Sequence, residues 1–216
     1  KGIGVEKDYS KTFKLYKKGS KLGSSSSFNS LGMLYNSGLG VDVDYSKAVK
    51  YFTEATKLGN AIGIFNLANH YEKGIGVEKD YTKAIELYEK AGNLGNANAL
   101  FNLGNLYLNG IGVSKSVSKA IDYFEKSAGY GNSTAYCNLA VIYQKGNGVK
   151  QDIKKAVFYF EKAADLGNLF ALKNLAFIYK KGQSVAKDVN KAREYFQRAA
   201  SLGDLVAKEE LNKLHK

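Results

Sequence analysis

The sequence predicts an all-α fold in which helical hairpins stack one after another in a solenoid. Three observations support this prediction: a repeat of fixed length, two apolar stripes with helical spacing inside each repeat, and glycines where the stripes end. The repeat length is 36 residues, as from Gly38 to Gly74, and it holds through the whole chain without an insertion. The columns that keep this register include Gly2, Gly38, Gly74, Gly110, Gly146 and Gly182, and Leu31, Leu67, Leu103, Leu139, Leu175 and Leu211.

The first stripe of each repeat predicts one helix, helix A. In residues 60–95 its members are Gly63, Leu67, Ala68 and Tyr71. Their spacing places them on one side of a helix, which needs a neighbour to bury that side. We therefore expect the leucine column to be core, and truncation of Leu103 to Ala should cost about 2 to 5 kcal/mol.

The second stripe predicts a second helix, helix B, whose members in the same repeat are Ala84, Leu87, Tyr88 and Ala91. Asp80 precedes this stripe and can cap the first free amides of the helix. Gly74 and Gly76 lie between the two stripes and suit a turn with positive φ, while Gly95 ends helix B. Each repeat is therefore a helical hairpin.

The register of the repeat predicts twelve helices in a single array over residues 1–216. The predicted units are a half-unit 1–23, full units 24–59, 60–95, 96–131, 132–167 and 168–203, and a half-unit 204–216. Neither end has the features of a polar capping unit, so we expect the chain to be a fragment of a longer protein.

Composition excludes several classes of protein. The single cysteine, Cys137, rules out an intrachain disulfide, and no apolar run approaches the ~20 residues of a membrane helix. The formal charge is +12, but Arg193 and Arg198 are the only arginines and most aromatic residues fall in packing columns. We therefore expect no nucleic-acid partner and no membrane insertion.

The repeat columns resemble Sel1-like repeats. The clearest copy contains Ala135, Leu139, Ala140, Tyr143, Gly146, Gly148, Val149, Asp152, Lys155, Ala156, Tyr159, Phe160, Ala163, Ala164, Gly167 and Asn168. The resemblance covers the whole chain, and it implies a right-handed superhelix with helix A on the concave side. It also implies a scaffold or adaptor that binds other proteins. Cys137 alone does not match the family branch that has paired cysteines and reported penicillin binding.

Serine replaces the usual residue at a few positions of the pattern. These are Ser24 to Ser27 at the start of the second unit, Ser116 at a capping aspartate, and Ser184 at a turn glycine. Serine also caps helices, so we expect the hairpins to persist.

A column of asparagines on helix A offers candidate contacts to a partner. Its members are Asn66, Asn102, Asn138 and Asn174, and Asn69 and Asn105 share a helix face with the first two. Carboxamides can pair with the backbone of an extended peptide, which makes the column a candidate binding ladder. The alternative is that each asparagine bonds the neighbouring helix and holds the stack together.

Two further sets of side chains on helix A are candidates. Phe65 and Phe101 could anchor a partner's apolar side chain, or could pack against the adjacent helix. In the C-terminal half the same face carries Lys145, Lys173, Lys180 and Lys181. These lysines could attract an acidic segment, although a lysine-rich surface is also common without any such role.

A catalytic site is not predicted. His70 and His215 stand in packing columns, and neither histidine has the spacing to form a metal set or a pair with Cys137. We predict no metal and no cofactor. The alternative to a scaffold is an enzyme, either one that hydrolyses a small ligand as β-lactamases do or one whose attached domain is catalytic.

The sequence gives weak indications of location. Our expectation is cytoplasmic, with the endoplasmic reticulum lumen as the alternative. Asn132, Ser133 and Thr134 form a glycosylation acceptor in a turn where we expect exposure.

Overall fold

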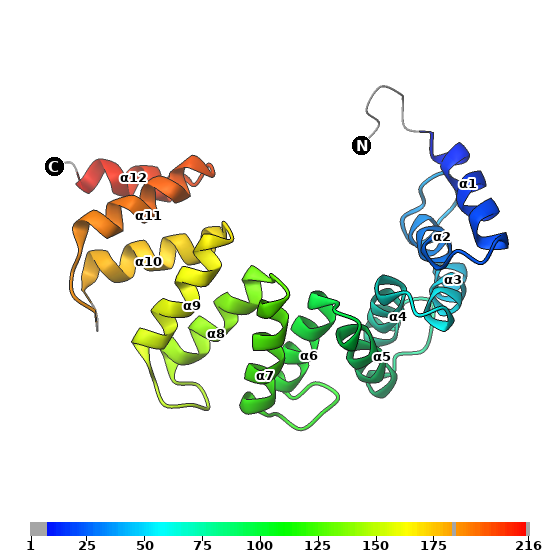
Figure 1. Ribbon diagram of the computed structural model, residues 1–216, viewed down its shortest axis with the longest axis horizontal. Coiled ribbons are helices and arrows are strands. Elements are labelled where there is room, and N and C mark those ends of the chain that lie inside the picture. The colour runs from blue at the N-terminus through cyan, green and yellow to red at the C-terminus, as the bar shows by residue number, and fades with distance from the viewer. Residues whose placement is uncertain (1–7, 183–184, 215–216) are drawn as a thin grey trace. The chain divides into compact units, whose positions relative to one another are not determined.

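The structure is a computed structural model that describes residues 8–182 and 185–214. Within these residues it contains twelve α-helices and no strand (Figure 1), as the repeat predicts. Gly2, Ser184 and His215, named above, lie outside the described residues.

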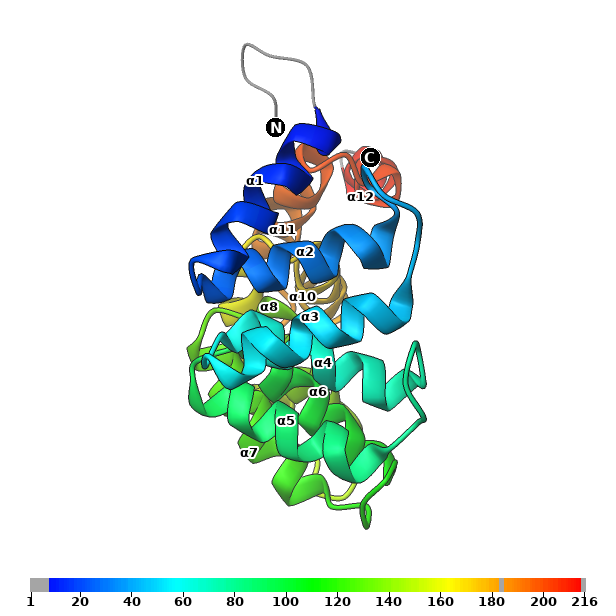
Figure 2. The same ribbon diagram turned by 90° about the vertical axis from the view of Figure 1, so that its right-hand side faces the viewer.

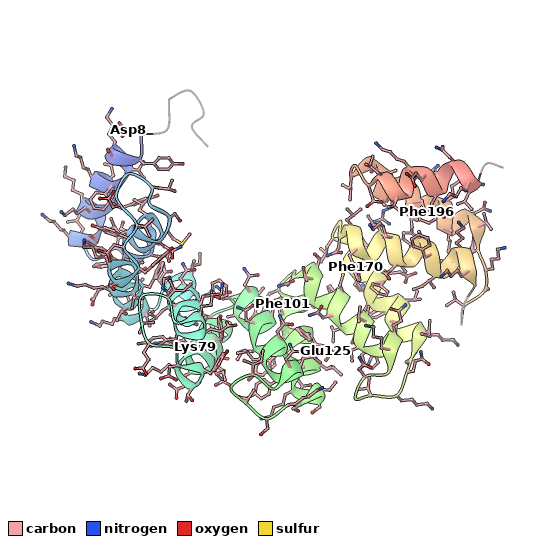
Figure 3. The ribbon with its side chains drawn as sticks, turned by 180° about the vertical axis from the view of Figure 1, so that it is seen from behind. Asp8, Lys79, Phe101, Glu125, Phe170 and Phe196 are labelled. Carbon is pink, nitrogen blue, oxygen red and sulfur yellow. The ribbon has the colours of Figure 1, made fainter. Side chains whose placement is uncertain are left out.

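The helices alternate between the two predicted types. The helices of type A are α2 (Ser25–Ser37), α4 (Ala61–Lys73), α6 (Ala97–Asn109), α8 (Ser133–Lys145), α10 (Leu169–Lys181) and α12 (Leu205–Leu214). The helices of type B are α1 (Tyr9–Lys21), α3 (Tyr45–Lys57), α5 (Tyr81–Asn93), α7 (Val117–Gly129), α9 (Ile153–Asp165) and α11 (Val189–Ser201). Asp8 caps the first of them, at the start of α1 (Figure 3).

The chain divides into two compact units. Unit 1 contains residues 1–103 with 111–113, and unit 2 contains residues 104–110 with 114–216. Within unit 1, helices α1 to α5 pack against one another in sequence order (Figure 2), and within unit 2 helices α7 to α12 do the same. The division of the chain into repeats at residues 24, 60, 96, 132 and 168, and the superhelical hand, stay predictions.

Local signals set the ends of the helices as predicted. Asp80 Oδ1 accepts a hydrogen bond from the Lys83 amide at 3.0 Å, and Ser116 Oγ accepts one from the Lys119 amide at 3.3 Å. Serine therefore replaces aspartate as a cap. Gly76 has a φ of 69°, and a Cβ there would lie 2.5 Å from the backbone of Tyr45, so the turn has no room for a side chain.

The core is made of repeat columns. The leucine column is buried from Leu31 to Leu175. The large residue at the centre of helix B is also buried in every full hairpin, as Phe52, Tyr88, Phe124, Phe160 and Phe196. Gly104 faces this column, since a Cβ there would lie 2.5 Å from the Phe124 ring. The leucines and the rings of these columns therefore form the core.

A column of lysines at the start of helix B stacks on the tyrosines of helix A. The ammonium groups of Lys47, Lys83, Lys119, Lys155 and Lys191 lie 4.1 to 5.4 Å from the ring centroids of Tyr35, Tyr71, Tyr107, Tyr143 and Tyr179. These distances are those of cation–π contacts. Five of the lysines in this cationic chain are thus part of the packing between the helices of a hairpin.

In the described part of the chain, each helix is too short or too polar to span a lipid bilayer.

Candidate partner-binding site

In unit 1 the predicted asparagine column bonds to neighbouring helices. Asn66 Nδ2 donates to Asn29 Oδ1 at 2.8 Å. Asn102 Nδ2 donates to the Tyr88 hydroxyl oxygen at 3.0 Å and lies 3.5 Å from Asn69 Oδ1. These contacts are the ones expected if the amides hold the stack together.

Tyr88 gathers these amides into one group, which we name the Tyr88 cluster: Tyr88, Glu72, Asn69 and Asn102. The Tyr88 hydroxyl lies 2.5 Å from Glu72 Oε2 and 2.8 Å from Asn69 Oδ1, so the two oxygens share its proton. Asn69 Nδ2 in turn donates to the Phe65 carbonyl at 3.0 Å. Burial, followed by the hydrogen bond to Glu72, raises the pKa of Tyr88 above its usual range. The hydroxyl therefore stays protonated, and it joins Glu72, Asn69 and Asn102 in one hydrogen-bond network.

In unit 2 the equivalent amides meet without a hydroxyl between them. Asn138 Nδ2 donates to Asn105 Oδ1 at 3.3 Å. One repeat after Tyr88 stands Phe124, which has no hydroxyl group, and one repeat after Glu72 stands Leu108. The partners that satisfy the amides of unit 1 are thus replaced by apolar side chains.

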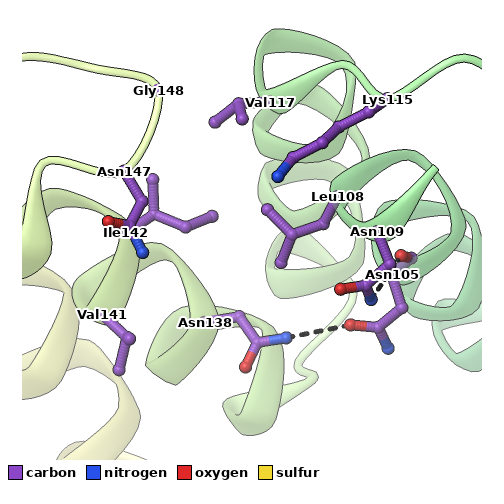
Figure 4. A pocket seen from close by; sticks show the side chains of 10 residues that line it. All are labelled: Asn105, Leu108, Asn109, Lys115, Val117, Asn138, Val141, Ile142, Asn147 and Gly148. Atoms are coloured by element: carbon purple, nitrogen blue, oxygen red, sulfur yellow. Dashed lines mark hydrogen bonds between the residues drawn. The ribbon is translucent and has the colours of Figure 1, made fainter.

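A cavity of about 730 Å³ opens beside this amide pair (Figure 4). We name it the Asn105 cavity. It is lined by Asn105, Leu108, Asn109, Lys115, Val117, Asn138, Val141, Ile142, Asn147 and Gly148. Its wall combines four carboxamides, one ammonium group and four branched apolar side chains, which is the composition of a site for a polar chain with apolar substituents.

The helices and one turn position the polar groups of the cavity. Asn109 Nδ2 donates to the Asn105 carbonyl at 2.9 Å, so its amide oxygen is left to face outward. Figure 4 shows the Lys115 ammonium group directed from the 110–116 turn toward the space beside Leu108. Asn109, Lys115 and Asn147 were not predicted from the sequence, because their columns vary between repeats and only the fold brings them beside Asn105 and Asn138.

The predicted aromatic contacts lie partly within the packing of unit 1. The Phe65 ring is half-buried and its centroid lies 5.9 Å from that of Tyr88. Phe101 is also half-buried and lies on α6 (Figure 3). One repeat later the same column holds Cys137, whose burial raises the pKa of its thiol to about 11. The column is thus closer to core than to surface.

The predicted basic face of α10 is largely neutralised within the chain. Lys173 Nζ lies 3.0 Å from Asp204 Oδ2, and Lys180 forms an ion pair with Glu210. These hydrogen bonds lower the pKa of Asp204 and of Glu210. The sequence contains an indication of this pairing. Asp204 and Glu210 stand one repeat after Asn168 and Asn174, so carboxylates replace amides at these two positions of the last repeat.

The remaining predicted contacts are dispersed over α8 and α10. Lys145 and Lys181 are exposed at the last turns of these helices. Asn174 Nδ2 donates to the Phe170 carbonyl of its own helix at 2.8 Å. The structure therefore brings together Asn105 and Asn138 from the predicted set, and it places Lys145, Lys181 and Asn174 outside the cavity lining.

Comparisons with known proteins identify the repeat. The family model described as the Sel1 repeat matches residues 1–24, 29–60, 61–96, 97–129, 133–168 and 169–204. The chain belongs to the Sel1 repeat family. No curated protein matched it in a sequence search.

Several solved structures are similar to this chain. A Sel1 repeat protein from Oxalobacter formigenes is 30% identical with a TM-score of 0.84, over 95% of this chain and 84% of that one. A protective antigen of uropathogenic Escherichia coli is 29% identical with a TM-score of 0.52, over 99% of this chain and 54% of that one. An immunity protein from Pseudomonas aeruginosa, 23% identical with a TM-score of 0.62, covers 93% of this chain and 76% of its own and shows the same fold.

His70, the histidine within the described residues, packs in the core. His70 is 6% exposed, and its ring centroid lies 5.3 Å from that of Phe52. Its Nδ1 lies 2.6 Å from the Ile75 carbonyl oxygen, so the neutral ring donates from that nitrogen. Burial lowers the pKa of His70. Across the described residues, no three or more His, Cys, Asp and Glu side chains are grouped to hold a metal ion.

The predicted glycosylation acceptor is part of a helix cap. Asn132 Oδ1 accepts hydrogen bonds from the amides of Thr134 at 3.0 Å and Ala135 at 3.1 Å. Asn132 is consequently half-buried and not freely exposed, because capping of α8 turns its side chain toward the helix.

Proposed function

We propose that the chain is a protein-binding scaffold that holds an extended segment of a partner in the Asn105 cavity. The observation that supports this most directly is the chemistry of the cavity wall. Carboxamides of Asn105, Asn109 and Asn138 offer both donors and acceptors, which an extended backbone needs, and the apolar wall offers contact area for side chains. Membership of the Sel1 repeat family adds support, since its members are typically interaction scaffolds.

The proposal moves the binding site relative to the sequence prediction. Asn66, Asn69 and Asn102 use their amide groups within unit 1, so they are weaker candidates than Asn105 and Asn138. In our proposal the other predicted positions are secondary contacts to a longer segment. They are Phe65, Phe101, Asn174, Lys145, Lys173 and Lys181.

We propose a non-catalytic role. The polar groups of the cavity are amides and one ammonium group, and this set contains no nucleophile with an adjacent base. The amides and the ammonium group of the lining are sufficient to bind a peptide, whereas an enzyme would need a nucleophile and a base in addition.

The test is selection of peptides from a random phage-displayed library on the chain, followed by measurement of their affinity by fluorescence anisotropy. Asn138→Ala should weaken the selected peptides about fivefold to tenfold, the effect of losing one hydrogen bond of about 1 to 1.4 kcal/mol. Asn174→Ala is the matched control, because Asn174 stands in the same column but outside the cavity lining, and it should leave the affinity unchanged.

Site-specific NMR separates this cavity from other surfaces. Bound peptide should shift the side-chain amide resonances of Asn105, Asn109 and Asn138 before those of Asn66. Equal weakening by both variants, or shifts confined to other residues, would refute the cavity as the binding site.

A further inference from the structure

The geometry points to a partner segment that is acidic, with a carboxylate that pairs with Lys115 at the rim of the Asn105 cavity. This inference rests on the proposed function and adds the chemical class of the partner. Its basis is the charge of the cavity, the hydrogen bonds of its amides and the difference between Lys115 and the equivalent residues of the two adjacent repeats.

The charged group that lines the cavity is the positive Lys115 ammonium group. Lys115 is exposed and forms no ion pair with any residue in ranges 8–182 and 185–214. No carboxylate lines the cavity, and the whole chain carries a formal charge of +12. Lys115 is thus the cation of a cavity wall without a carboxylate, and its positive potential attracts a negatively charged group to the cavity.

Lys115 stands on a turn that is held in place. The Ser116 amide donates to the Tyr107 carbonyl at 2.8 Å, which ties the end of the turn back to α6. Gly110 has a φ of 71°, and a Cβ there would lie 3.1 Å from the Lys115 Cβ. The base of the lysine is therefore held close to α6, and its side chain extends from there toward the space beside Leu108 (Figure 4).

In the amides of Asn105 and Asn109, one polar atom forms a hydrogen bond within the chain and the other is left for a ligand. Asn105 Oδ1 accepts the hydrogen bond from Asn138, so the N–H groups of the Asn105 amide are the ones left for a ligand. Asn109 Nδ2 is occupied by the Asn105 carbonyl, so Asn109 presents its oxygen. One donor, one acceptor and one cation in succession match a peptide carbonyl, a peptide N–H and an acidic group.

The equivalent turns of the two adjacent repeats do not offer the same cation. Lys79 stands one repeat before Lys115, and its ammonium group lies 4.6 Å from the Tyr81 ring centroid. Gln151 stands one repeat after it, is uncharged, and donates to the Gln144 carbonyl at 2.8 Å. Lys79 thus provides a matched control: the same residue type at the same turn position, already in contact with a ring.

The test uses three pools of fluorescein-labelled nonapeptides that are random in uncharged residues except at one central position. The first pool has a central Asp and an amidated C-terminus, the second a central Asn and an amidated C-terminus, and the third a central Asn and a free C-terminal carboxylate. We expect the Asp pool to bind at least fivefold more tightly than the amidated Asn pool by anisotropy at low salt. Tighter binding of the third pool would assign the carboxylate to a chain terminus instead of a side chain.

Variants show whether Lys115 is the cause of the preference. Lys115→Gln should remove the difference in affinity between the Asp pool and the amidated Asn pool, while Lys79→Gln should keep that difference. Loss of the preference in both variants, or its survival in Lys115→Gln, would show attraction to the basic surface in general and overturn the inference.

The outcomes also separate this inference from the proposed function. If all pools bind equally and Asn138→Ala weakens them all, the scaffold proposal holds and the acidic partner is refuted. If no pool binds, the proposed function fails and this inference fails with it.

Discussion

The Tyr88 cluster and the Asn105 cavity are built from the same repeat columns, and yet one is closed and the other is open. Both contain a pair of asparagines from two successive helices of type A. In the first, the Tyr88 hydroxyl and Glu72 satisfy the amides. In the second, Phe124 and Leu108 occupy those columns, and the amides bond only weakly to each other at 3.3 Å beside the cavity.

This difference shows how a repeat protein can acquire a binding site at one position. Repeats that share a core can differ in a single hydroxyl and a single carboxylate, which decide whether a pair of amides is consumed by the fold. The core columns are unaffected, because Tyr88 and Phe124 are both fully buried. Specificity can therefore change from repeat to repeat without a change in the stack.

The largest expected effect tests whether the two regions share one kind of core. Leu103→Ala and Leu139→Ala each remove a fully buried leucine, and each should lower the free energy of unfolding by about 2 to 5 kcal/mol. Urea denaturation followed by circular dichroism measures both. A loss below about 1 kcal/mol in either variant would contradict the equivalence of the two cores.

A smaller effect tests the role of the hydroxyl. Tyr88→Phe makes the Tyr88 cluster resemble the Asn105 cavity, and it leaves Glu72 and Asn69 without their shared donor. We expect a loss of about 1 to 3 kcal/mol in the free energy of unfolding.

The reciprocal variant is the control for that experiment. Phe124→Tyr brings a hydroxyl to the column position that faces Asn105 and Asn138, so it should change stability by about 1 kcal/mol or less. It should also weaken peptide binding, since the amides gain an internal partner. Equal destabilisation by Tyr88→Phe and Phe124→Tyr would show that the hydroxyl does not distinguish the two regions.

The smallest expected effect is on the pH dependence of stability. It concerns the repeat column that contains His70 in unit 1 and Leu106 in unit 2. Burial lowers the pKa of His70 in the folded state, so below an unfolded pKa of about 6.5 the unfolded chain binds more protons. Stability should therefore fall as the pH decreases from about 6.5 toward the folded pKa. His70→Leu should flatten this slope in unfolding titrations at pH 7.5 and pH 5.5, and an unchanged slope would contradict a neutral buried ring.

Much of the fold could be predicted from the sequence because its causes are local. Asp80 caps the helix that begins beside it, and Gly76 makes a turn that no other residue fits. The core position of Leu103 follows from its column, since the copies from Leu31 to Leu175 are all buried, while Leu211 at the end of the array is half-buried. The candidate site was predicted only in part: Asn105 and Asn138 were named, whereas Lys115 and Asn109 stand in columns without a consistent residue.

The sequence by itself determined the repeat, the two helices of each hairpin, their caps and the columns that form the core. These features depend on residues a few positions apart, or on the same position in successive repeats. Only the tertiary structure decided which amides are engaged and which remain open, because that depends on pairs separated by 33 to 37 residues and on the side chain that lies between them. A hydroxyl at residue 88 and its absence at residue 124 become meaningful only when the neighbouring helices are in contact.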